Sequence, residues 1–68
     1  MEEKVRLTTR EVDVLRHLAR GLTYAQAARE LRMSAHTAAT HVKNAYRKLG
    51  VHSAAAAVMQ AVRLGLIL

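Results

Sequence analysis

The residues from Thr23 to Leu49 constrain the fold most, because they read as two helices joined by a turn of only a few residues. Thr23 is followed three residues later by Gln26, the spacing of a capping box that begins a helix. Ser34 is expected to cap a second helix over residues 35–49. That helix carries basic and small polar side chains on faces that need not be buried, which is typical of a DNA recognition helix. A helical hairpin in a small bundle, with a merely solvated basic face, is the alternative interpretation.

The charge balance favours a polyanionic partner for this pair of helices. The 68 residues include eleven Lys and Arg against five Asp and Glu, a formal net charge of +6 at pH 7. For a small domain this charge favours nucleic acid first and an anionic membrane surface second. No apolar run approaches the ~20 residues of a membrane span, and the start of the chain lacks the apolar segment of a signal peptide. We therefore expect a soluble, cytoplasmic protein that does not insert into membranes.

A first helix is predicted ahead of this pair, from Thr9 to about Arg20. Thr8 and Glu11 have the spacing of another capping box, and Gly21 suits the left-handed residue that ends a helix. Apolar residues recur at helical spacing on one side of this segment, so its main role is expected to be scaffolding. The amides at Thr8 and Thr9 could still contact a phosphate, because helix N-termini suit anions.

A last helix is predicted from Ala54 to about Leu64, capped by Ser53 and stopped by Gly65. It is apolar nearly all round, so one face is expected on its own domain and the other on a partner, such as the same helix of a second subunit. An alanine-rich helix that simply hides little area is the alternative. The residues predicted for the dimer interface are Ala54, Ala57, Val58, Ala61 and Leu64.

The whole chain is predicted to form one all-α domain of four helices over residues 1–68, with residues 1–6 frayed. It has no repeats, no low-complexity linker and no shift of composition that would mark a second domain. With no cysteine, neither a disulfide nor a thiolate metal site can stabilise so small a core.

Catalysis and metal binding are not expected from the residue types present. The four histidines include no pair at the i, i+4 spacing and have no cysteine partner, whereas zinc sites need clustered ligands. There is no serine, histidine and acid set at a suitable spacing and no glycine-rich phosphate loop. We therefore expect no enzymatic activity, no metal, no cofactor and no small-molecule ligand.

Short motifs along the chain resemble the LuxR-type (NarL/FixJ, GerE-like) DNA-binding domain from Leu7 to Leu66. In order, these motifs are LTTRE at 7–11, GLT at 21–23, AREL at 28–31, MSAHT at 33–37, HV at 41–42 and KLGVHS at 48–53. Their order and spacing are more specific than any one of them. The resemblance implies a tetrahelical helix-turn-helix fold that regulates transcription as a dimer, with the last helix at the dimer contact.

Site residues follow partly from the resemblance and partly from the exposed positions of the 35–49 helix. Lys43 matches a family position that reaches into the major groove, and Ala39 stands where the family often has a groove-contacting lysine. An alanine there could still contact a thymine methyl group. The base-reading candidates are His36, Ala39, Thr40 and Lys43. The phosphate-contacting candidates are Thr8, Thr9, Thr23, Thr37, Asn44, Arg47 and Lys48.

Two further interpretations compete with a LuxR-type regulator that binds double-stranded DNA as a homodimer. Region four of sigma factors shares a step like Gly21 to Tyr24, but it predicts a chain that ends soon after the recognition helix. A helix-turn-helix relic that binds another regulator would explain Ala39 and Ala54, where positive charge is expected. Retention of Lys43 and its basic neighbours favours DNA, and RNA polymerase is a further candidate partner.

Overall fold

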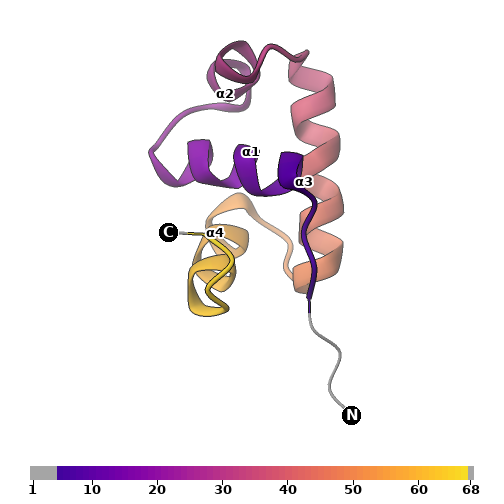
Figure 1. Ribbon diagram of the computed structural model, residues 1–68, viewed down its shortest axis with the longest axis vertical. Coiled ribbons are helices and arrows are strands. Elements are labelled where there is room, and N and C mark those ends of the chain that lie inside the picture. Colours follow the sequence, from indigo (N-terminus) through magenta and orange to yellow (C-terminus); the bar gives the residue numbers. More distant parts are fainter. Residues whose placement is uncertain (1–4, 68) are drawn as a thin grey trace.

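The computed structural model describes residues 5–67, which form four helices and no strand. They are α1 (Thr9–Ala19), α2 (Tyr24–Leu31), α3 (Ala35–Leu49) and α4 (Ala54–Arg63). Helix α1 crosses α3 and packs against each of the other three helices, with α2 near one end of α3 and α4 near the other (Figure 1). The predicted all-α, four-helix fold is confirmed. None of these helices is long and apolar enough to cross a membrane.

The segment predicted to fray, residues 1–6, is described only from Val5 onward. Residues 1–4 lie outside the described residues. Val5 is half-buried and packs against the core, as does Leu7 just before α1. Within the segment predicted to fray, residues 1–6, the apolar side chain of Val5 thus packs on the core.

Every helix begins at a hydroxyl residue, as predicted. The side chains of Thr8, Thr23, Ser34 and Ser53 each accept a hydrogen bond from the backbone N–H three residues on. At α1 and α2 the bond is reciprocated by Glu11 and Gln26, whose side chains accept from the cap N–H at 2.9 Å. These caps satisfy amides that a helix leaves without partners, and they fix where each helix starts.

Every helix also ends in the same way, with a residue in the left-handed conformation. The residue after it donates its N–H back to the carbonyl five positions earlier, as Met33 does to Ala28 at 2.9 Å and Val51 does to Tyr46 at 3.0 Å. Three of these left-handed residues are glycines. At the end of α2 the position is taken by Arg32, with φ 59° and ψ 45°.

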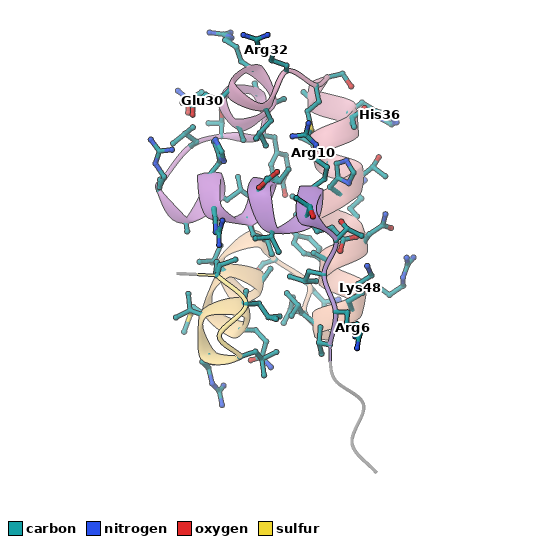
Figure 2. The ribbon with its side chains drawn as sticks, viewed as in Figure 1. Arg6, Arg10, Glu30, Arg32, His36 and Lys48 are labelled. Carbon is teal, nitrogen blue, oxygen red and sulfur yellow. The ribbon has the colours of Figure 1, made fainter. Side chains whose placement is uncertain are left out.

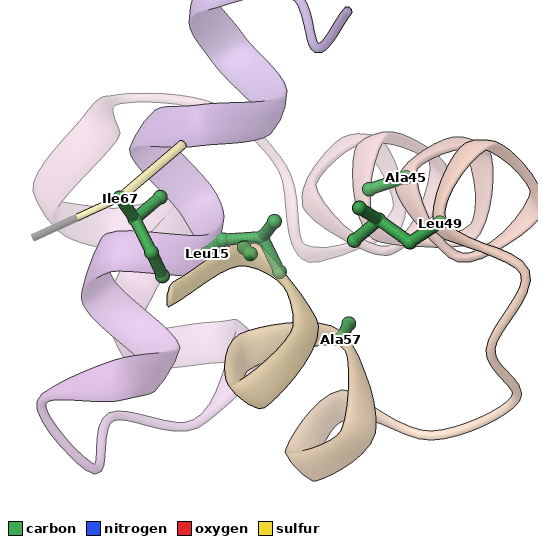
Figure 3. Packing of buried hydrophobic residues seen from close by; sticks show 6 residues of the cluster. Leu15, Ala45, Leu49, Ala57 and Ile67 are labelled. Atoms are coloured by element: carbon green, nitrogen blue, oxygen red, sulfur yellow. The ribbon is translucent and has the colours of Figure 1, made fainter. Parts of the chain in front are cut away.

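The core consists of two clusters on opposite sides of α1. One joins α1, α3, α4 and the C-terminal segment around Leu15 and Ile67, with three fully buried alanines (Figure 3). The other joins α1, α2 and α3 around Val14 and Val42, again with buried alanines. Because alanine is small, the helices approach closely at both clusters. Helix α3 contributes to both, so its orientation is set along its whole length.

Helix α4 is apolar on both faces, and its inward face includes two of the residues that were predicted for the dimer interface. Ala57 and Ala61 are fully buried against the rest of the domain, so they present no surface to a partner. The prediction for these two residues is corrected, because the packing of α4 against α1 and α3 turns them inward. The outward apolar side chains are Met59, Val62 and Leu64, which are 66%, 42% and 47% exposed.

Candidate nucleic-acid interface

The outer face of α3 is a line of polar and basic side chains opposite the core. The buried residues of the helix recur at spacings of three and four and end at Leu49, so they occupy one side of it. The side chains at spacings i, i+4, i+7 and i+11 from His36 lie on the opposite side and are all exposed. Figure 2 shows His36 projecting from α3 away from α1. The members of this line, called the α3 outer line below, are His36, Thr40, Lys43 and Arg47.

Within the α3 outer line, the Lys43 side chain is free to reach a ligand. No hydrogen bond or ion pair joins it to another residue in the described range 5–67. The Thr40 hydroxyl instead donates to the His36 carbonyl at 3.0 Å, so its oxygen keeps only acceptor capacity. The Arg47 guanidinium donates to Asn44 Oδ1 at 3.1 Å, which steadies both side chains on the exposed surface.

The remaining predicted site residues flank the α3 outer line or lie at helix starts. Ala39 is half-buried beside Lys43 and Thr40, so a base edge that reaches those residues passes close to its methyl group. Thr37 is exposed, and its hydroxyl accepts from Ser34 Oγ at 2.8 Å, which leaves its own proton available. The other three are the exposed threonines at the starts of α1 and α2, Thr8, Thr9 and Thr23.

Lys48 is held differently from the other predicted phosphate contacts. Its Nζ donates to both carboxylate oxygens of Glu11, at 2.9 and 3.2 Å. The Glu11 side chain is only 3% exposed, whereas that of Lys48 is 35% exposed. Burial alone would raise the pKa of Glu11, but the hydrogen bonds from Lys48 and from the Thr8 N–H and hydroxyl lower it below its ordinary value. Glu11 is therefore ionised at neutral pH and Lys48 is its partner.

Two exposed basic residues, one just before α1 and one in its first turn, were not among the predicted site residues. Arg6 lies on the segment that leads into α1, on the same side of the molecule as Lys48 (Figure 2). It is exposed, as is Arg10, which pairs with Asp13 at 3.6 Å. Arg6 was assigned to a frayed segment. The signal that could have found it is a basic residue next to Leu7, whose packing orders that segment.

Helix α3 carries no acidic residue of its own. Each acidic residue in the described range has a basic partner, and all three lie on α1 or α2. Residues 35–68 contain no Asp or Glu at all. A phosphate that approaches the outer face of α3 therefore meets only cations and neutral groups of that helix.

Two tyrosines tie α2 to α3. Their hydroxyl groups lie 2.8 Å apart, between Tyr24 on the first turn of α2 and Tyr46 near the end of α3. Burial, together with this hydrogen bond, raises the pKa of Tyr46 to about 12. Both rings pack against the α1–α2–α3 cluster. The pair is a structural contact, and it fixes the angle at which α2 supports α3.

The histidines are spread over the molecule rather than gathered. Within residues 5–67, no three His, Cys, Asp or Glu side chains are close enough together to hold a metal ion. His17 joins α1 to α2 instead: its Nδ1 lies 2.8 Å from the Asp13 carbonyl and its Nε2 lies 3.2 Å from Glu30. Its role is to connect helices.

The sequence model of the GerE family, described as bacterial regulatory proteins of the luxR family, matches residues 5–61. The chain belongs to the LuxR family. This confirms the resemblance seen in the motifs, and it makes α2, the turn at Arg32 and α3 the helix-turn-helix of a DNA-binding domain of transcription regulators. Proteins of the LuxR family are DNA-binding regulators of transcription, not enzymes.

Two transcription regulators share substantial identity with the chain. The nitrate/nitrite response regulator protein NarP of Escherichia coli is 47% identical over 53 residues, which cover 78% of this chain and 25% of NarP. The HTH-type transcriptional activator RamA of Corynebacterium glutamicum is 37% identical over 65 residues, 96% of this chain and 23% of RamA. The chain thus spans about a quarter of the length of these relatives.

Two solved structures have the same fold as this chain. The transcription factor GerE superposes with a TM-score of 0.87 at 29% identity, covering 97% of both chains. The response regulator ChrA of a heme-sensing two-component system gives a TM-score of 0.88 at 36% identity. That match covers 97% of this chain and 33% of ChrA. The likeness to GerE therefore extends over nearly the whole chain.

Proposed function

We propose that this LuxR-family domain binds double-stranded DNA in a sequence-specific manner, with α3 in the major groove. The observation that carries the proposal is the α3 outer line, which lies opposite the core and has no acidic neighbour on its helix. A major groove admits one α-helix, and the helix must present its readers on the side away from its scaffold. The α3 outer line meets this requirement over about three turns.

Base reading is assigned to the first three residues of the α3 outer line and to Ala39, which lies beside them. Lys43, which has no partner in residues 5–67, can donate to guanine O6 or N7. Thr40 offers an acceptor, His36 lies one turn before it, and the Ala39 methyl group can contact a thymine methyl. Arg47 is assigned to the DNA backbone, where each neutralised phosphate adds affinity by releasing counterions.

Further backbone contacts are assigned to neutral donors around the α3 outer line. Thr37 has a free hydroxyl proton at the start of α3, and Asn44 lies beside Arg47 on its flank. Contacts of this kind set the register of a protein on the duplex without reading its sequence. The remaining assigned residues are the helix-start threonines Thr8, Thr9 and Thr23.

Dimerisation through α4 is the second part of the proposal. Met59, Val62 and Leu64 give the helix an exposed apolar face, and Ala54 and Val58 border it. A twofold dimer would space two recognition helices ~34 Å apart and would match a pseudo-palindromic operator. Two further parts of the proposal are that the domain acts in the cytoplasm and that RNA polymerase is a further partner.

Fluorescence anisotropy with short duplexes tests the proposed function. A site selected from random DNA should bind at least ~10³-fold more tightly than a scrambled duplex, with a steep dependence on salt. Lys43→Ala should weaken binding to the selected site by about 1–3 kcal/mol and relax the base preference at one position in each half-site. Arg63→Ala, on exposed α4, is the matched control and should leave this preference unchanged.

The outcomes of this experiment separate the proposed function from its rivals. Equal losses by Lys43→Ala on the selected and scrambled duplexes would remove base reading from Lys43. Binding of both duplexes with one affinity would mean that the domain reads only the DNA backbone. No binding at low salt would favour a protein partner on the exposed face of α4.

A further inference from the structure

Lys48 has the charge and exposure of a phosphate contact, yet its ammonium group is hydrogen-bonded to Glu11. Both oxygens of the Glu11 carboxylate accept from Lys48 Nζ, and one of them also accepts from the Thr8 N–H at 2.9 Å. A single carboxylate therefore caps the start of α1 and holds the last turn of α3, although the two residues are 37 positions apart in the chain. In Figure 2 Lys48 lies beside the segment that enters α1.

The location of Glu11 creates an electrostatic problem for a DNA-binding surface. The start of α1 offers exposed threonines, and its capping box leaves the amides of Thr9 and Arg10 for a phosphate. An ionised carboxylate three residues inside the same helix cancels that attraction and would repel a phosphate. The buried position of Glu11 makes the repulsion stronger, because water screens a buried charge poorly.

We infer that Lys48 is a positioning residue for DNA binding, which neutralises the Glu11 carboxylate so that a backbone phosphate can approach the start of α1. It does not itself contact phosphate. The paired charges sum to zero, and each lies at the helix end that favours its sign, Glu11 at an N-terminus and Lys48 at a C-terminus. This inference rests on the proposed function, since it requires a DNA backbone next to α1 and α3.

The salt dependence of DNA binding distinguishes a positioning lysine from a phosphate-contacting one. Loss of one phosphate contact lowers the slope of log K against log salt by ~0.9, whereas loss of a buried partner leaves the number of contacts unchanged. Repulsion between two unit charges about 6 Å apart would lower the binding affinity roughly 3-fold in bulk water and roughly 100-fold near a protein surface. We therefore expect Lys48→Met to weaken binding by about tenfold with an unchanged slope.

The double variant Glu11→Gln/Lys48→Met decides the question even if Lys48→Met alone fails to fold. Glutamine keeps an oxygen for the Thr8 N–H, as Gln26 does for Thr23, so the capping box survives without the charge. Anisotropy on the selected and scrambled duplexes across a salt series should give an affinity within about threefold of the wild type and the same slope. Arg47→Met is the matched control and should lower the slope by ~0.9.

The inference is overturned if the double variant loses as much slope as Arg47→Met, because Lys48 would then be a phosphate contact. It is also overturned if the double variant binds as weakly as Lys48→Met with an unchanged slope, because neutralising Glu11 would then have no effect. A wild type that binds both duplexes equally would refute sequence-specific binding, the proposed function. The comparison of slopes would still hold, since it can be made on the scrambled duplex alone.

Discussion

Arg32, the residue that ends α2, allows a direct test of backbone strain in this helix-turn-helix. Arg32 adopts the left-handed conformation with φ 59°, at the position where the other three helices have glycine. A side chain in this conformation brings Cβ close to the following carbonyl oxygen, which glycine avoids. We expect Arg32→Gly to stabilise the domain and Gly50→Ala, the reciprocal change at the end of α3, to destabilise it.

The magnitude follows from two opposing effects. The left-handed conformation costs an L-residue about 1–2 kcal/mol, while glycine loses about 0.5–1 kcal/mol more on folding through backbone entropy. Arg32→Gly should therefore gain roughly 0.5–1 kcal/mol, and Gly50→Ala should lose a similar amount. No clash with the rest of the domain adds to the second figure, because a Cβ at Gly50 would meet no atom within 4 Å beyond the glycine and its two chain neighbours.

Thermal unfolding followed by circular dichroism measures both changes. For a domain of this size the expected free energies correspond to shifts in Tm of about 2–8 °C, upward for Arg32→Gly and downward for Gly50→Ala. Arg32→Ala is the control, since it removes the side chain but keeps the strained backbone, and its Tm should stay near that of the wild type. A lower Tm for Arg32→Gly, or an unchanged Tm for Gly50→Ala, would refute the strain argument.

Three other predictions concern the core and its titrating groups. Leu15→Ala, at a fully buried position, should cost about 2–5 kcal/mol in urea unfolding, and a loss below 1 kcal/mol would mean that α1 is not the centre of the core. Because the folded pKa of Tyr46 lies near 12, above its ordinary 10.0, stability should fall as the pH rises from 10 to 12. Tyr46→Phe should flatten this decline in alkaline denaturation. Because the folded pKa of Glu11 lies below 4.5, its contribution should disappear as the pH falls below that value, and Glu11→Gln should remove this acid sensitivity.

Helix positions were predictable from the sequence because their signals are local. Thr8 with Glu11 and Thr23 with Gln26 each need only four residues to form a capping box, and both boxes form in the structure. Helix α3 has the predicted bounds, residues 35–49, because Ser34 begins it and a glycine ends it. The helix-turn-helix and its outward basic face follow from the same short-range information.

Features that depend on pairing between distant elements could not be read from the sequence. Lys48 has the sequence context of an outward cation, and only the crossing of α1 over α3 brings Glu11 to it. A helix that is apolar all round has no marked inward side, so packing alone turned Ala57 and Ala61 into the core. The left-handed Arg32 lacks a glycine to signal it, although a turn this short before Ser34 requires such a residue.

The alanines at the helix crossings make the position of α3 sensitive to small changes in volume. Alanine loses no side-chain rotamer freedom when it is buried, and it offers no flexible side chain that could yield to a larger neighbour. Ala38 and Ala45 are fully buried on the inner side of α3. One added methyl group at either position would have to be accommodated by movement of the helix backbone. Natural variation at these two alanines would therefore shift α3, the helix that we propose enters the major groove, relative to the rest of the domain.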